Sequence, residues 1–204
     1  MTIVIVDTGV ANRHSIRNAL EHIGCDVTLS ADAAVIRDAG KLVFPGVGAF
    51  EAGMRSLAAR GLVDVLRQDV TERGKPILGI CLGMQMMAAI GEEDGEHAGL
   101  GWLPGRVRRL APSDPQLKVP HIGFNTVTWK PGTRLFAGLP DAADFYFVHS
   151  YHVDTAPEVV SATADHGGAF TAAVERDNIM GVQFHPEKSQ AAGLQLLRNF
   201  VNLA

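Results

Sequence analysis

Short apolar runs alternate with helix-like patterns through the first half of the chain. Residues 2–6 form a β-branched apolar run, which is typical of a buried strand. Over 12–23, apolar residues recur on one face of an expected helix that Gly24 ends. The alternation continues with strands at 26–29, 41–44 (stopped by Pro45-Gly46) and 76–80, and with helices over 50–68, interrupted near Gly61, and over 82–90. This succession predicts parallel strands joined by right-handed crossovers.

The second half has a different pattern, in which β-like segments follow one another without helices between them. They lie at 106–110, 125–130, 145–148, 159–164, 169–175 and 180–184, and a last helix covers 190–203. Residues 91–105 are rich in Gly, Glu and Asp and are expected to form an exposed loop. The predicted fold is therefore α/β: a single flavodoxin-like domain over 1–204, with a central, mostly parallel sheet flanked by helices and antiparallel strands in the C-terminal half.

Composition narrows the class of protein. The 204 residues are 47% hydrophobic and 20% charged, which is enough for one sizeable core. A net charge of −4 and no run of Lys and Arg argue against nucleic-acid and membrane-surface partners. The N-terminal segment has no basic region before its apolar run, and no apolar run approaches the ~20 residues of a membrane span. Two cysteines without a CxxC spacing suit a reducing cytoplasm.

Cys81 is the strongest candidate for a nucleophile. It lies in Gly79-Ile80-Cys81-Leu82-Gly83, between an expected strand and an expected helix. Gly-x-nucleophile-x-Gly at such a turn is the nucleophile elbow, whose sharp backbone requires small neighbours. The alternative is a small buried core cysteine, which is the interpretation favoured for Cys25, whose one neighbouring glycine is explained as a helix stop.

A cysteine nucleophile requires a base, and His185 is the best placed of the eight histidines. It closes the expected strand 180–184, and ligands bind at the carboxyl ends of strands in open α/β sheets. Pro186 stiffens the segment, and Glu187 is near enough to hydrogen-bond one imidazole nitrogen and leave the other facing the sulfur. His-Pro-Glu alone is a weak signal that would also fit a loop, but it becomes strong beside the elbow.

A third segment, 44–50, contains two glycines in three residues at the end of another expected strand. Such glycines let backbone N–H groups approach a ligand, and backbone donors stabilise the oxyanion of acyl transfer. An ordinary βα turn is at least as good an explanation for this segment taken alone. A dinucleotide loop is rejected because the GxGxxG spacing is absent.

Together these segments resemble the triad-type, or class I, glutamine amidotransferases. The chain most resembles the glutaminase subunits of imidazole glycerol phosphate synthase, which serve histidine biosynthesis. The resemblance rests on four segments: Pro45-Gly46-Val47-Gly48-Ala49-Phe50, Gly79-Ile80-Cys81-Leu82-Gly83-Met84-Gln85, Tyr146-Phe147-Val148-His149-Ser150-Tyr151 and Gly181-Val182-Gln183-Phe184-His185-Pro186-Glu187-Lys188-Ser189.

The resemblance implies a role for each matching position. Cys81, His185 and Glu187 would be the catalytic triad. Other positions are implied as a set: Leu82, Val47 and Gly48 for the oxyanion hole, Gly46, Gln85, Ser150 and Tyr151 for glutamine, and Asn12, Phe124 and Lys188 for the partner interface. It also implies a heterodimer with a (β/α)₈-barrel cyclase, to which ammonia from L-glutamine passes, and no cofactor.

Two segments depart from the family pattern. The family commonly has Asp-Tyr-Gly-x-Gly-Asn where this chain has Asp7-Thr8-Gly9-Val10-Ala11-Asn12, and Met-Gly-Trp-Asn where it has Ile122-Gly123-Phe124-Asn125. Both are expected near the partner, so they affect the predicted interface more than the predicted chemistry.

Other functions remain open. The alternatives are the glutaminase of another ammonia-channelling synthase, a cysteine hydrolase that shares the elbow, and a catalytically inactive glutamine sensor. His121, His149 and His152 raise the idea of a metal site, but no HExxH or Cys/His cluster at ligand spacing accompanies them. No metal is therefore predicted, and His149 and His152 are expected to satisfy local hydrogen bonds or to line the glutamine site.

Overall fold

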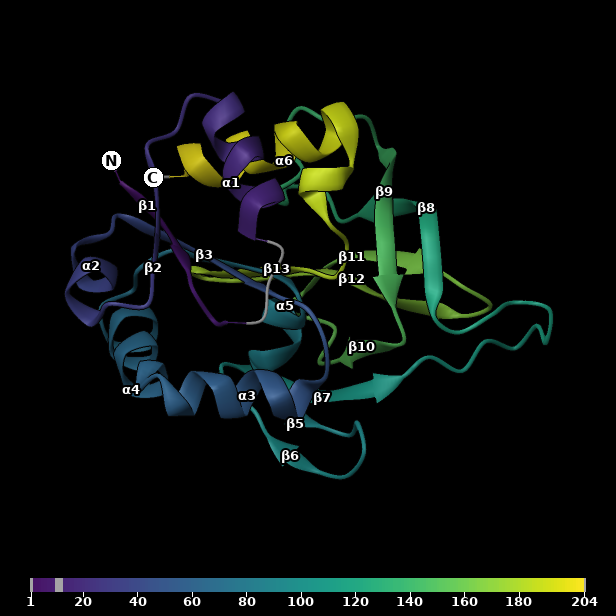
Figure 1. Cartoon of the computed structure of the whole chain (residues 1–204). Coiled ribbons are helices and arrows are strands. Elements are labelled where there is room, and N and C mark those ends of the chain that lie inside the picture. The colour runs from purple at the N-terminus through teal and green to yellow at the C-terminus, as the bar shows by residue number, and fades with distance from the viewer. Residues whose placement is uncertain (1, 10–12, 204) are drawn as a thin grey trace.

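A mixed β-sheet runs through the whole molecule (Figure 1). The structure, a computed structural model, describes residues 2–9 and 13–203. Within these residues the larger sheet has nine strands, of which five are parallel. In spatial order the parallel strands are β2 (Val27–Ser30), β1 (Ile3–Val6), β3 (Lys41–Gly46), β4 (Ile77–Cys81) and β13 (Ile179–Val182).

Antiparallel strands extend this sheet and form a second one. From β13 the sheet continues through β12 (Ala169–Arg176), β11 (Val160–Asp165), β8 (His121–Trp129) and β9 (Ala142–His149). The smaller sheet has the order β10 (Tyr151–Asp154), β7 (Leu103–Arg109), β5 (Ala88–Gly91) and β6 (His97–Ala98). The expected α/β class and the antiparallel C-terminal half are both confirmed.

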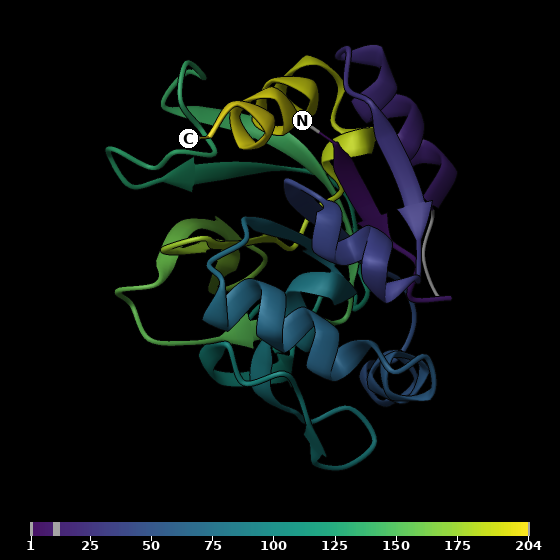
Figure 2. The ribbon, with the colours of Figure 1, turned by 90° about the vertical axis from the view of Figure 1, so that its left-hand side faces the viewer.

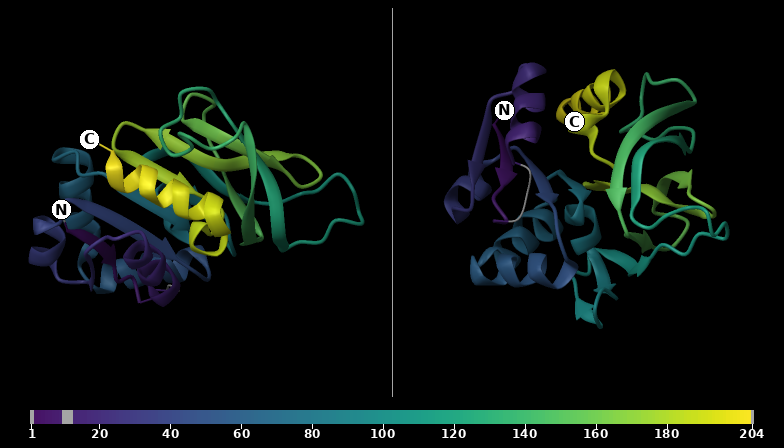
Figure 3. Two further views of the ribbon diagram at one scale, coloured as in Figure 1. Left: turned by 90° about the horizontal axis from the view of Figure 1, so that it is seen from above. Right: turned by 45° about the vertical axis from the view of Figure 1, so that its right-hand side comes forward.

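Helices cover the two faces of the large sheet as separate layers. On one side, α1 (Arg13–His22) and α6 (Gln190–Asn202) pack on a core cluster that includes Leu20 and Phe200. On the other, α2 (Ala33–Asp38), α3 (Phe50–Ala59), α4 (Leu62–Arg67) and α5 (Leu82–Met86) share a second cluster with the smaller sheet. Figures 2 and 3 show both layers from other sides. No helix in the described residues is long and apolar enough to cross a membrane.

Several local signals explain where these elements begin and end. Asp32 caps α2, because its carboxylate accepts hydrogen bonds from the Ala34 and Val35 amides. Gly61 separates α3 from α4 in the left-handed conformation, with φ +66°. The C-terminal end of α6 is stabilised by Lys41 of β3, whose buried ammonium donates hydrogen bonds to the last carbonyls of that helix.

Some expected boundaries are wrong. The helix predicted over 82–90 ends at Met86, and the following residues become β5, which pairs with β7. Residues 91–105 are consequently not one exposed loop, since they contain β6 and the start of β7. Strand β3 does not stop before Pro45 but pairs with β4 as far as Gly46, whereas β13 stops at Val182, short of the expected 184. Strand β10, helix α2 and the first residues of β8 were not predicted.

Candidate active site

The carboxyl ends of three parallel strands bring the candidate residues to one edge of the sheet. In the register of β3 and β4, Gly46 lies beside Cys81. In the register of β13 and β4, Val182 lies beside Ile80, so the chain that follows Val182 leaves the sheet next to the cysteine. Segments distant in sequence therefore meet where open α/β sheets bind ligands.

The backbone at Cys81 is strained, and both neighbouring glycines are required by their surroundings. Cys81 has φ +55° and ψ −115°, a conformation that residues with a Cβ rarely adopt. A Cβ at Gly83 would lie 1.8 Å from the Phe44 carbonyl oxygen, and one at Gly79 would lie 2.8 Å from the Met84 Cα. The elbow therefore lets α5 pack directly on the strands while holding the sulfur at the edge of the sheet.

His185 is held through one ring nitrogen and through its backbone. Its Nδ1 lies 2.8 Å from Glu187 Oε1, and its backbone amide donates to the Tyr146 carbonyl of β9. Ser189 reinforces the link, because its hydroxyl donates to the His185 carbonyl and accepts from the Tyr146 amide. The other nitrogen, Nε2, is buried and has no hydrogen-bond partner among the described residues.

The electrostatic surroundings of His185 favour its protonated form. Burial lowers the pKa of the ring, but the Cys81 sulfur and the Glu187 carboxylate together outweigh burial and raise that pKa to about 9. Cys81 and His185 also line the same cavity. The sulfur therefore lies close enough to the imidazole to favour the protonated ring.

A cavity of about 410 Å³ opens in front of this pair, within the usual range for small-molecule sites. Most of the predicted oxyanion and glutamine residues line it: Val47, Gly48, Leu82, Gln85, Ser150 and Tyr151. Gly46 does not line it; a Cβ there would meet the Leu82 Cβ at 2.9 Å, so its part is to let β3 approach α5.

Two polar residues near the cysteine were missed from the sequence. Glu93 lines the cavity, and its carboxylate accepts a hydrogen bond from the Phe50 amide. It lies in the acidic segment that was interpreted as an exposed loop, so composition concealed it. Gln183 is fully buried, and its Nε2 lies 3.7 Å from Cys81 Sγ. The sequence feature that could have revealed Gln183 is a polar residue inside an otherwise apolar strand pattern.

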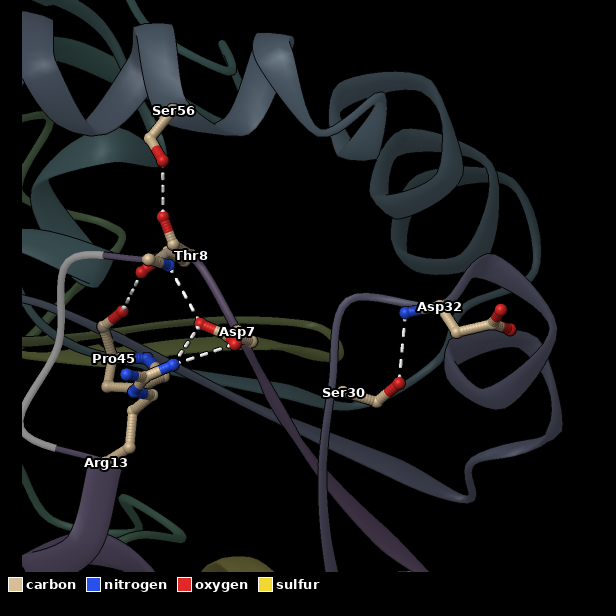
Figure 4. Close-up of polar contacts among 8 residues, drawn as sticks. Asp7, Thr8, Arg13, Ser30, Asp32, Pro45 and Ser56 are labelled. Atoms are coloured by element: carbon tan, nitrogen blue, oxygen red, sulfur yellow. Dashed lines mark hydrogen bonds and ion pairs between the residues drawn. The ribbon is translucent and has the colours of Figure 1, made fainter.

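The end of β3 is hydrogen-bonded to the segment that follows β1. The Thr8 hydroxyl donates to the Pro45 carbonyl at 3.4 Å, and the Ser56 hydroxyl donates to the Thr8 carbonyl at 2.6 Å (Figure 4). Thr8 is one of the departures from the family pattern, and it contacts the segment that carries Val47 and Gly48. Gly48 has φ +98°, so this position requires glycine.

Two of the residues predicted at the partner interface, Phe124 and Lys188, lie on the outer side of the β8–β9 hairpin and beside it. Phe124 is 51% exposed and contacts the Tyr146 ring edge-on, with the ring centroids 5.6 Å apart. The Lys188 ammonium lies over the same tyrosine ring, 5.4 Å from its centroid. Asn12 lies outside the described residues.

A cysteine, a histidine and a buried carboxylate at the carboxyl edge of an α/β sheet have the arrangement of cysteine-dependent hydrolases with a nucleophile elbow. Comparison with known proteins narrows this class. The family model described as Glutamine amidotransferase class-I matches residues 4–203. The chain belongs to this family, and its curated relatives place it among the HisH subunits.

The relatives match over nearly their full length. The imidazole glycerol phosphate synthase subunit HisH of Syntrophotalea carbinolica is 48% identical and covers 97% of this chain and 98% of its own. The HisH of Caulobacter vibrioides is 44% identical and covers 98% and 97%. A crystal structure of a glutamine amidotransferase has a TM-score of 0.75 at 20% identity, covering 97% of this chain and 96% of its own, which supports the fold.

Proposed function

We propose that this chain is the glutaminase subunit of an imidazole glycerol phosphate synthase, releasing ammonia from L-glutamine for a partner subunit. The observation that carries the proposal is the cavity lined by both Cys81 and His185, with the His185 ring held from behind by Glu187. Its family and its near-full-length HisH relatives support the same function.

Glutamine would bind between β10, α5 and the loop after β3. The Gln85 side chain is held for this purpose by two hydrogen bonds from its Nε2, to the Tyr151 carbonyl and to Gln183 Oε1, both at 2.9 Å. Ser150 and Tyr151 form the opposite wall, and Gly46 lets β3 approach closely. Glu93 supplies a carboxylate that can pair with the ammonium group of an amino acid.

The first chemical step transfers the acyl group to sulfur. The Cys81 thiolate attacks the side-chain carbonyl carbon of glutamine, and the imidazolium of His185 holds the proton that the departing nitrogen needs. Backbone N–H groups of Leu82 and of Val47 or Gly48 would stabilise the oxyanion, with a loss of about 3–4 kcal/mol for each donor removed in comparable sites. Ammonia leaves, and a glutamyl thioester remains.

The second step hydrolyses the thioester. His185, now neutral, takes a proton from water as the water oxygen attacks the thioester carbon. The carbon–sulfur bond breaks, glutamate leaves, and the proton on His185 again faces the thiolate. Glu187 keeps the ring in one orientation through both steps, since its carboxylate bonds Nδ1 and leaves Nε2 for the chemistry.

The partner would be a (β/α)₈-barrel cyclase that uses the ammonia to make imidazole glycerol phosphate. It would dock on the face formed by Phe124, Ile122, Val148 and Lys188, of which Ile122 is 60% exposed and Val148 36%. Asn12 is assigned to the same interface by the family resemblance alone. Val148 also lines the cavity, so a partner here would cover its mouth and keep ammonia from water. Both cysteines are free thiols, which fits a cytoplasmic protein.

The test is glutamate release from glutamine by the purified chain with and without a barrel cyclase and its nucleotide ligand. We expect activity that rises with the loaded partner and disappears in Cys81→Ala. Stimulation by a different synthase would favour another ammonia donor, and amide or peptide hydrolysis without glutamine would favour a general cysteine hydrolase. Full glutaminase activity in Cys81→Ala would refute the proposal.

A further inference from the structure

A chain of hydrogen bonds leads away from the nucleophile toward the antiparallel half of the sheet. Gln183 Nε2 contacts Cys81 Sγ, and Gln183 Oε1 accepts from Gln85 Nε2. Gln85 Nε2 also donates to the Tyr151 carbonyl. That carbonyl has a second partner, because His149 Nδ1 lies 2.9 Å from it.

The chain continues through two histidine rings. His149 Nε2 lies 3.1 Å from His121 Nδ1, and His121 Nε2 lies 3.2 Å from Asn125 Nδ2. Asn125 Nδ2 also donates to the Asp165 carbonyl at 2.7 Å. These contacts form one continuous path from the sulfur of Cys81 to strand β8.

The direction of every hydrogen bond in this path is determined by its two ends. The Tyr151 carbonyl can only accept, so His149 carries its proton on Nδ1 and its Nε2 accepts. His121 must then donate from Nδ1, and its Nε2 must accept from the Asn125 amide. Adding a proton to either ring would turn an acceptor into a donor and place two N–H groups against each other, at His121 or at Asn125. The arrangement is complete only when both rings are neutral.

We propose that His121 and His149 are positioning residues. As a neutral pair with ordered protons, they fix the position of the Tyr151 carbonyl. Through that carbonyl, Gln85 and Gln183, they fix the positions of the glutamine-binding side chain and the nucleophile relative to strand β8. The kinetic consequence rests on the glutaminase function proposed above. The proton arrangement itself does not depend on that function.

The surroundings of the pair favour the neutral form. Both rings are buried, and burial is the main reason that the pKa of His121 falls to about 4 and that of His149 to about 3. The titratable groups that face them are other histidines: His166 stacks on His121 with the ring centroids 4.1 Å apart, and His152 lies in β10. Within the described residues neither ring is hydrogen-bonded to a carboxylate, and the hydrogen bond from His149 to the Tyr151 carbonyl only partly offsets the burial of a positive charge.

Strand β8 gives the pair its significance. His121 lies on the inner side of the strand, whereas Ile122 and Phe124 are exposed on the other side. A partner that docks on the exposed side therefore presses on the same strand that anchors the hydrogen-bond path. His121 and His149 are cross-strand neighbours in β8 and β9, so this path and the docking face belong to one hairpin.

The position of the donor nitrogen on each ring predicts which replacements preserve function. An asparagine amide nitrogen occupies nearly the place of a histidine Nδ1, whereas a glutamine amide reaches the place of Nε2. Since both histidines donate from Nδ1, His149→Asn keeps the donor to the Tyr151 carbonyl and His149→Gln does not. For the complex with its partner, we expect His149→Asn to raise the KM for glutamine about threefold, because it keeps the donor to the Tyr151 carbonyl but leaves the His121 Nδ1–H without its acceptor. His149→Gln and His121→Phe should raise it about tenfold with a smaller change in kcat, the effect of one lost hydrogen bond.

His166→Phe is the matched control, because it keeps a ring stacked on His121 while its own hydrogen bond goes only to the Lys118 carbonyl. It should leave KM unchanged. Equal effects of Asn and Gln at position 149, or a KM defect in His166→Phe as large as that in His121→Phe, would overturn the positioning role. Urea unfolding of each variant separates these outcomes from a failure to fold.

The second measurement is long-range ¹H–¹⁵N correlation of the ring nitrogens in the full chain, from pH 5 to 8. We expect two histidines, assigned by the variants, to stay neutral throughout with the proton on Nδ1. An Nε2–H tautomer at either position, or a positive charge on either at pH 6, would overturn the proton arrangement. If the tautomers are as expected but KM does not change in any variant, the proton arrangement is correct and the kinetic role is refuted. The Cys81→Ala assay then tests the glutaminase function separately.

Discussion

The strained backbone at Cys81 predicts that the nucleophile is held at a cost in stability. With φ +55° and ψ −115°, a residue with a Cβ at this position carries about 1–3 kcal/mol of strain. Cys81→Ala removes the sulfur and keeps the Cβ, so the strain stays. Cys81→Gly removes both, so the difference between the two variants isolates the backbone.

The expected size of this difference follows from three contributions. Glycine relieves the strain of about 1–3 kcal/mol, loses about 0.8 kcal/mol for the buried methyl group, and costs a further ~0.5–1 kcal/mol in backbone entropy. The entropy contribution can be measured separately by Ala58→Gly, at an exposed position in α3 where the backbone is helical and glycine should cost about 1 kcal/mol. Relative to that control, glycine at position 81 should be favoured by roughly 1–2 kcal/mol.

Urea unfolding of the original protein, Cys81→Ala, Cys81→Gly and Ala58→Gly, with the free energy extrapolated to water, measures these differences. All variants at position 81 should lack glutaminase activity, whereas Ala58→Gly should retain it. If glycine destabilises position 81 as much as it destabilises position 58, the elbow is not strained in solution, and the argument that links its geometry to the placement of the sulfur is wrong.

Three further predictions concern stability and pH. Gly83→Ala should abolish glutamine hydrolysis and lower the free energy of unfolding by about 3 kcal/mol, because the new Cβ would lie 1.8 Å from the Phe44 carbonyl oxygen and α5 must move. Kinetics measures the first effect and urea unfolding the second. Lys41→Met should cost about 3 kcal/mol in urea unfolding, because it leaves the last carbonyls of α6 without their buried ammonium donor, while Lys118→Met at an exposed position should cost little. The pKa of His149 is lowered from 6.5 to about 3, so the unfolded chain binds more protons between these values and stability falls as pH drops below 6.5, by at most about 2 kcal/mol at pH 5. His185 has the opposite sign, since its pKa of about 9 stabilises the fold below pH 6.5 and this stabilisation disappears as pH rises through 9. In unfolding curves across pH 5–9.5, His149→Asn should weaken the first slope, to which the lowered pKa of His121 also contributes, and His185→Gln should remove the second.

The sequence predicted best what is determined by neighbouring residues. The elbow at Cys81 depends on two glycines within two positions of it, and those glycines meet backbone atoms that any such turn would bring near. His185 was found because a strand end, a proline and a carboxylate lie together in the chain. Such local patterns carry their geometry with them.

What the sequence did not predict depends on contacts between distant segments. The sequence predicted a helix over 82–90, but pairing of β5 with β7 ends the helix at Met86. Glu93 was assigned to a loop for the same reason, since only this pairing brings it to the cavity. Tertiary pairing regularly outweighs local propensity in short segments.

The two halves of the sheet divide the work of the site between them. Parallel strands β3, β4 and β13 end at one edge, where they place the proposed oxyanion loop, nucleophile and base. These ends contain no residue of the exposed apolar face on the β8–β9 hairpin, so they cannot by themselves respond to a protein that docks there. The antiparallel strands contain the contacts that the proposed response requires, because β9 bonds the His185 segment through Tyr146 and the His121–His149 pair links β8 to the Tyr151 carbonyl. A glutaminase whose base and substrate wall are both fastened to the docking hairpin has the connections needed for its activity to depend on its partner.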